Sequence, residues 1–268
     1  MNNFEEMLTL PFKQELIFDD YWFYEDEWFF ISKAFWKLRI DLSPEAVAVL
    51  TAMSYYILPL KNKTNFQTIP LNDKFMVHSL GLNLSNNHKE LSYIRKGMTE
   101  LEDKGIITSM QMFGDYKAYK QVSVQNNGKE TNNFIKISRA DYLKIIHSDN
   151  TPKYKMQLIA CYLMIMANCF EIPYEKMKSY ESDTANLRMF PICYESLESI
   201  GERYGVNRKT AGRHVDALAN LGVIYRKSFV KSTSINKIYI TRPDAKSVEW
   251  MDSVINAQIK EGYIIKVL

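Results

Sequence analysis

The chain has 268 residues, of which 46% are hydrophobic and 24% are charged, and its formal net charge at pH 7 is +3. This length suits two domains, and the composition is that of a globular protein, which excludes a disordered chain. No apolar run approaches the roughly 18 residues that a membrane span requires, and the N-terminus has no secretory-signal pattern. We therefore expect a cytoplasmic protein that does not associate with a membrane.

Residues 1–27 are predicted to form an acidic, aromatic arm. Residues 1–30 hold eight acids and one lysine, and ten aromatic residues lie between Phe18 and Trp36. One interpretation is a flap over the core of the first domain, because aromatic side chains bury large areas. The other is an arm that docks on another protein or on the chain's own basic segment.

The remaining chain contains one unit twice, at 28–125 and at 133–242, and the polar stretch 126–132 is predicted to be a linker. Each copy opens with a short apolar strand, then Ile-Ser, a basic residue and Ala, within Phe30–Trp36 and Lys136–Tyr142. A long helix that begins with proline follows in both, because proline fits the first turn of a helix. These helices are expected at Pro44–Leu58 and Pro152–Asn168.

Each copy continues with two helices joined at a glycine, followed by two strands. In the second copy, Tyr194–Gly205 predicts the first helix and 208–221 the second, with Asn207 as its N-cap and Gly222 at its end. Three apolar residues at helical spacing predict the buried face of the second helix: Ala211, Val215 and Leu218. The two strands are expected at Val223–Val230 and Asn236–Thr241.

The first copy repeats this pattern in weaker form, since Leu101–Ile107 aligns with Leu218–Ile224. Its first helix is expected at Leu71–Leu80, before Gly81, and its strands at Ile106–Phe113 and Tyr116–Gln125. Helix, turn, helix and hairpin is the winged-helix arrangement. We therefore predict a mostly α fold with small β wings (α+β), built from two tandem winged-helix domains, with a C-terminal helix and tail at 243–268.

Basic residues gather in the second copy. Residues 203–242 hold nine Lys or Arg and one acid, a net charge of +8, whereas Ser85–Lys120 carries only +1. Lysine and arginine neutralise DNA phosphates, so the second domain is predicted to be the main DNA-binding domain. The first domain is expected to bind DNA more weakly or to serve as a protein–protein surface.

Specific residues are candidates for these contacts. Arg208 and Arg213 suit bidentate contacts to guanine, and His214 is interpreted as a surface or packing histidine. The candidate DNA-binding residues of the second domain are Asn207, Arg208, Lys209, Thr210, Arg213, Lys227, Lys231, Ser232 and Lys237. Those of the first domain are Asn86, Asn87, Lys89, Ser92, Arg95 and Lys96. Helix capping and loop solvation are the alternative for Asn86 and Asn87.

No motif for catalysis or for a cofactor stands in the sequence. There is no phosphate-binding or dinucleotide-binding glycine loop, and the three cysteines and four histidines have no metal-ligand spacing. We therefore expect no enzyme, no catalytic residue, no metal site and no cofactor.

The repeated unit resembles the winged helices of plasmid replication initiators of Gram-positive bacteria, some of which carry two such domains. This resemblance covers about 28–242 at the level of architecture. It implies a replication initiator of a plasmid or mobile element that binds double-stranded DNA, forms a homodimer and contacts a host replication protein. A dimeric transcriptional regulator that binds a promoter operator and contacts the transcription machinery is the alternative. A third reading is a protein-interaction module with degenerate winged helices.

Overall fold

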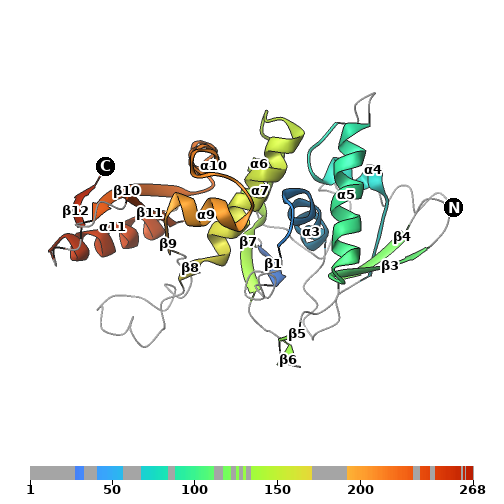
Figure 1. Cartoon of the computed structure of the whole chain (residues 1–268), viewed down its shortest axis with the longest axis horizontal. Coiled ribbons are helices and arrows are strands. Elements are labelled where there is room, and N and C mark those ends of the chain that lie inside the picture. Colours follow the sequence, from blue (N-terminus) through green and yellow to red (C-terminus); the bar gives the residue numbers. More distant parts are fainter. Residues whose placement is uncertain are drawn as a thin grey trace, which may run out of the picture. The chain divides into compact units, whose positions relative to one another are not determined.

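A computed structural model describes most of the chain after its N-terminal arm. The described residues are 28–32, 41–56, 68–83, 88–111, 117–121, 125–126, 129–130, 134–170, 192–231, 236–241, 245–260, 262 and 264–267. They form a mostly helical structure with eight helices and short strands (Figure 1). The contacts divide the chain into two compact units, Met1–Met156 and Gln157–Leu268. The predicted acidic arm, residues 1–27, lies outside the described residues.

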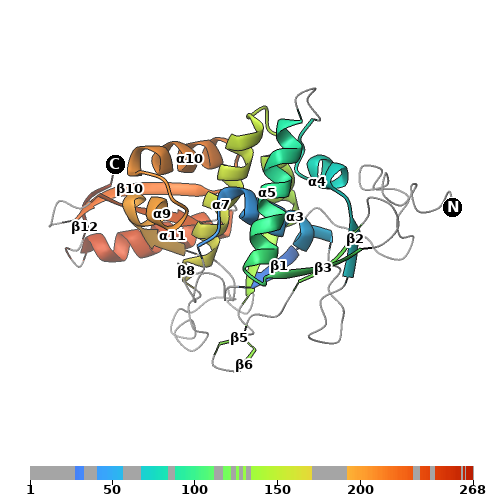
Figure 2. The ribbon, with the colours of Figure 1, turned by 45° about the vertical axis from the view of Figure 1, so that its right-hand side comes forward.

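Unit 1 combines helices with a small antiparallel sheet. Its elements are β1 (Trp28–Ser32), α3 (Pro44–Tyr56), β2 (Thr68–Leu71), α4 (Asp73–Ser79), α5 (Lys89–Asp103), β3 (Ile107–Gln111), β4 (Lys117–Gln121), β5 (Gln125–Asn126), β6 (Lys129–Glu130), β7 (Phe134–Ser138), α6 (Arg139–Ile146) and the start of α7 (Pro152–Ala167). The sheet has the strand order β2-β4-β3. Helix α5 packs against both α3 and α4, as Figure 2 shows.

Unit 2 repeats this plan with a larger sheet. After the remainder of α7 come β8 (Cys169–Phe170), β9 (Ile192–Glu195), α9 (Leu197–Arg203), α10 (Arg208–Asn220), β10 (Tyr225–Lys231), β11 (Asn236–Thr241), α11 (Ala245–Lys260) and β12 (Ile264–Val267). The strand order is β12-β10-β11-β9-β8. Its central part, β10-β11-β9, has the same connection order as β3-β4-β2 of unit 1, with two helices between the first strand and the hairpin in each.

The local signals in the sequence account for these helices. Asn72 and Ser196 cap α4 and α9 at equivalent positions, and each side chain accepts a hydrogen bond from the backbone three residues on. Gly81 and Gly205 follow these helices with φ angles of 60° and 77°, where a residue without Cβ is unstrained. Ser138 likewise caps α6, since its hydroxyl accepts from the amide of Asp141 at 3.3 Å.

Strands β2 and β9, which occupy the same place in the two units, are not among the predicted strands. Thr68–Leu71 and Ile192–Glu195 each pair with the second hairpin strand of their unit. The prediction that the first helix of the second copy starts at Tyr194 is therefore wrong, because Tyr194 pairs with Tyr239 and the helix begins at Leu197. Strands of four residues bounded by a helix cap carry little periodicity of their own, so the sequence pattern favoured an extended helix.

The strands that open the two sequence repeats pair with each other. β1 and β7 are antiparallel, with Phe30 opposite Lys136, which are equivalent positions of the repeat. In the repeat, Trp28 corresponds to Phe134 and Ser32 to Ser138. Each of these residues pairs with the counterpart of the other, since Trp28 faces Ser138 and Ser32 faces Phe134. This is the register of an isologous pair, in which two copies of one segment meet through the same residues.

The boundary between the compact units consequently differs from the predicted one. Strand β7 and helix α6, which the sequence assigned to the domain at 133–242, belong to unit 1, and the division falls after Met156. The physical reason is the pairing of β7 with β1. Alternate side chains of both strands are buried: Phe29 and Ile31 of β1, and Ile135 and Ile137 of β7. The predicted linker 126–132 contains parts of a small hairpin, β5 and β6.

Within the described part of the chain, every helix is too short or too polar to cross a membrane.

Candidate nucleic-acid interface

Helix α10 carries most of the predicted contacts, and its ends are defined locally. The amide of Thr210 donates to the Asn207 side chain at 2.9 Å, which confirms the predicted N-cap. At the other end, Gly222 has a φ angle of 63°, and the amide of Val223 donates to the carbonyl of Leu218 at 3.0 Å. This closing pattern satisfies helix carbonyls that would otherwise lack a donor.

One face of α10 is buried and the opposite face is basic. The predicted inward residues Ala211, Val215 and Leu218 are fully buried, and His214 joins them. Arg208, Lys209 and Arg213 are exposed, together with the N-cap Asn207 and Asp216. The guanidinium of Arg213 donates to the hydroxyl of Thr210 at 3.1 Å, so these two predicted contacts lie side by side.

Acidic residues compensate part of this basic charge. Arg208 pairs with Glu198 of α9 at 3.1 Å, and Arg203 pairs with Glu195 at 3.3 Å. Glu195 and Glu198 lie just outside the window 203–242, so the net charge of +8 for that window overstates the local charge. Lys209 has no ion pair with any described residue. Exposed pairs contribute about 0–1 kcal/mol, so Arg208 can still exchange its partner for a phosphate.

The hairpin residues have different surroundings. Lys227 is bonded to Asp252 of α11 at 2.5 Å, and this hydrogen bond, opposed by partial burial, raises the pKa of Lys227. Lys231 and Lys237 lie on β10 and β11, where Lys237 faces Phe229, but their side chains are outside the described part. Ser232 lies wholly outside the described residues.

The corresponding helix of unit 1 is α5, and it has the same two-faced construction. Leu91, Ile94, Met98 and Leu101 are buried. The predicted contacts Lys89, Ser92, Arg95 and Lys96 are all exposed, while Asn86 and Asn87 lie outside the described residues. The helix starts after His88, which has a φ angle of 51° and provides no side-chain cap.

Two of the predicted cations of α5 are held in ion pairs within unit 1. Arg95 binds Asp73 of α4 at 2.7 Å, and Lys96 binds Glu45 of α3 at 3.2 Å. Neither acid lies in the segment whose net charge was counted. The outward face of α5 is therefore more nearly neutral than that of α10, in the direction that the sequence predicted.

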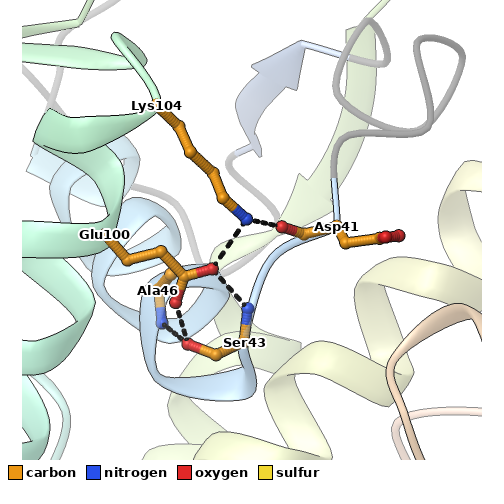
Figure 3. Close-up of polar contacts among 5 residues, drawn as sticks. All are labelled: Asp41, Ser43, Ala46, Glu100 and Lys104. Carbon is orange, nitrogen blue, oxygen red and sulfur yellow. Dashed lines mark hydrogen bonds and ion pairs between the residues drawn. The ribbon is translucent and has the colours of Figure 1, made fainter.

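The last turn of α5 is bound to the start of α3 (Figure 3). Glu100 accepts from the backbone amide of Ser43 at 2.9 Å and from the Ser43 hydroxyl, and Lys104 donates to Glu100 at 3.0 Å and to the carbonyl of Asp41. Ser43 in turn caps α3 through the amide of Ala46 at 3.2 Å. Burial pushes the pKa of Glu100 up, but the bonds from Ser43 and Lys104 outweigh it and lower the pKa below its usual value.

His214 has a partner that the sequence did not reveal. Its Nδ1 lies 2.8 Å from the hydroxyl of Tyr204, and both side chains are buried. Burial, reinforced by the charge of Arg213, lowers the pKa of His214 to about 4. The histidine is therefore neutral at pH 7 and joins α10 to the end of α9, which makes it a packing residue rather than a ligand.

Among the described residues, no group of three or more His, Cys, Asp or Glu side chains is arranged to hold a metal ion. Cys161 and Cys193 are buried, and burial raises the pKa of each thiol to about 12, so neither is an activated nucleophile.

Comparison of the chain with protein-family models, with curated proteins and with solved structures finds no match.

Proposed function

We propose that the protein is a sequence-specific double-stranded DNA-binding protein built from two winged-helix units, with α10 as its main recognition helix. The observation that carries this proposal is the exposed row Arg208, Lys209 and Arg213 on α10, opposite a fully buried stripe and beside the β10–β11 hairpin. A helix of this kind fits the major groove, where an arginine fork matches guanine and a lysine neutralises phosphate.

The two units contribute unequally in this proposal. Residues 203–242 have the larger excess of basic residues, and Lys209 has no ion pair with any described residue, whereas acidic partners are present for Arg208 of α10 and for Arg95 and Lys96 of α5. Binding through α5 requires these acids to give up their partners or to approach phosphates themselves. Unit 2 therefore supplies most of the affinity, and α5 adds a weaker contact.

The biological role follows from the resemblance of the repeated unit to plasmid initiators. We propose a cytoplasmic, non-catalytic replication initiator of a plasmid or mobile element, acting as a homodimer without a cofactor. The symmetric register of β1 and β7 supports an internal duplication, as expected of a chain with two related DNA-binding units. The alternative is a transcriptional regulator.

Selection of bound fragments from the replicon and the host genome tests this function. At about 150 mM salt, where non-specific binding is weak, enrichment of tandem repeats beside an AT-rich tract supports the initiator. A single promoter-proximal palindrome supports the regulator instead. Absence of any enriched fragment contradicts sequence-specific binding.

Variants then test the assignment of residues on α10. Arg213→Ala is expected to relax base preference at one position by about 1–3 kcal/mol. Lys209→Ala is expected to weaken binding to all duplexes and to lower the salt slope, which is the dependence of the logarithm of the binding constant on the logarithm of the salt concentration, by about one. Lys260→Ala removes an exposed cation from α11 and serves as the charge-matched control. Equal losses on selected and random DNA for Arg213→Ala would refute its role in base recognition.

A further inference from the structure

Two neighbouring cations of β10 point to opposite faces of the hairpin. Successive side chains of a strand alternate between faces, so Arg226 and Lys227 lie on different sides. On the Arg226 side, the directly paired residue Ile240 is buried, and on the Lys227 side Phe229 is buried. Each of the two cations therefore lies on the same face of the hairpin as a buried apolar residue.

Each cation is bound to a carboxylate on a different helix. Arg226 forms an ion pair with Asp216 of α10. Lys227 forms an ion pair with Asp252 of α11 at 2.5 Å, and only 29% of the Lys227 side chain is exposed. Figures 1 and 2 both show α10 and α11 on opposite sides of the hairpin.

Helix α11 is itself anchored on the sheet. Met251 and Ile255 are buried, and α11 contacts β11 and β12. Asp252 follows Met251 directly, so the packing of the helix places the carboxylate at the edge of the apolar contact, beside the Lys227 ammonium. The ammonium also lies 5.9 Å from the centre of the Tyr225 ring.

We propose that Arg226 and Lys227 are positioning residues that hold β10, the first strand of the wing formed by β10 and β11, between α10 and α11. In this proposal Lys227 does not contact DNA. This inference rests on the proposed function, because the wing needs an orientation only if it meets DNA together with α10. Lys227 then stands apart from the other predicted DNA contacts, and the C-terminal helix has a role in DNA binding without a DNA contact.

The direction in which Asp252→Asn changes the affinity for DNA distinguishes the two possible roles of Lys227. If Lys227 were a phosphate contact, Asp252→Asn would release it, raise the affinity for DNA and steepen the salt slope by about one. If Lys227 holds the wing, the same substitution loosens the hairpin and lowers the affinity. We expect a loss of about two- to fivefold with an unchanged salt slope, since a partly exposed ion pair contributes modestly.

The experiment measures binding of the full chain to a short mixed-sequence duplex and to a selected fragment, by fluorescence anisotropy over a range of salt concentrations. Glu249→Gln is the matched control. Glu249 is an exposed acid of the same helix, and it has no ion pair with a described residue. Lys227→Gln is expected to act like Asp252→Asn. The exchanged pair Lys227→Glu with Asp252→Lys is expected to recover the wild-type affinity, which a lost phosphate contact would not do.

Amide hydrogen exchange provides a second measurement that does not depend on DNA. Asp252→Asn is expected to speed exchange at the backbone amides of β10 and β11, and Glu249→Gln is not. A gain of affinity in Asp252→Asn, or unchanged exchange in the hairpin, overturns the inference. If the wild-type chain binds neither duplex, the proposed function fails, and the exchange experiment alone decides whether the two ion pairs hold the hairpin.

Discussion

Gly81 and Gly205 occupy the same place in the two repeats, yet substitution by alanine should affect them very differently. Both have positive φ angles, and an alanine in the left-handed region costs about 1–2 kcal/mol. At Gly205 a Cβ would meet nothing within 4 Å, so only this backbone term applies. At Gly81 the added Cβ would lie 2.1 Å from the backbone oxygen of Ile146, which no side-chain rotation can relieve.

The collision at Gly81 also involves a buried ammonium group. Lys155 donates to the carbonyl of Gly81 at 2.9 Å and to that of Ile146 at 2.7 Å, so moving either backbone segment breaks a bond of a buried charge. Leaving such a group unsatisfied costs about 1–3 kcal/mol, or more for a charge. We therefore expect Gly205→Ala to lose about 1–2 kcal/mol and Gly81→Ala to lose at least about 4 kcal/mol.

Urea denaturation followed by circular dichroism measures both losses in the full chain. Amide exchange at α4 and α6 for Gly81→Ala, and at α9 and α10 for Gly205→Ala, assigns each loss to its unit, because two compact units need not unfold together. Gly105→Ala is a further control with positive φ and open space around the added Cβ. Similar losses for Gly81→Ala and Gly205→Ala would refute the close contact between α4 and α6.

Two further predictions concern pH and helix capping. His214 is buried and its pKa is lowered to about 4, so the folded state disfavours its protonation. The contribution of the neutral histidine to the free energy of unfolding is fully present above the unfolded pKa of 6.5 and is lost as the pH falls toward 4. This loss is on the order of 3 kcal/mol. Urea midpoints measured from pH 7 to pH 4 should therefore fall less in His214→Gln than in wild type. Parallel curves for the two proteins would contradict the lowered pKa of His214. Ser43→Ala removes the cap of α3 and a partner of Glu100, and thermal denaturation should show a loss of about 1–2 kcal/mol. Because Glu100 has a lowered pKa, its contribution is present above the ordinary value of 4.5 and is lost as the pH falls below it, so Ser43→Ala should approach wild type in acid; a deficit that is constant with pH would show that Glu100 is not involved.

Much of the local structure was predictable from the residues alone. Pro44 and Pro152 start the long helices as expected, and Asn207 and Gly222 bound α10 where the pattern placed them. These signals are local, because a cap or a helix-breaking glycine acts on a backbone only a few residues away. The apolar stripe of α10 was equally predictable, since helical spacing by itself brings Ala211, Val215 and Leu218 to one face.

The candidate interface was predictable only in part. Exposure of Lys209 and Arg213 followed from the stripe on the opposite face. The acids that bind Arg208 and Lys227 did not, because Glu198 and Asp252 are 10 and 25 residues away from their partners in the sequence. Counting charges in a window misses carboxylates that folding brings back to the same surface.

The sequence by itself determined the long helices and their order, the cap, the end and the buried face of α10, and the presence of a repeat, since each depends on spacing within a short segment. Tertiary structure alone decided the pairing of β1 with β7, the short strands β2 and β9, and the bond between Tyr204 and His214. These features join segments that are distant in the chain or too short to show a period. Their stability comes from hydrogen bonds and burial between elements, which no local pattern records.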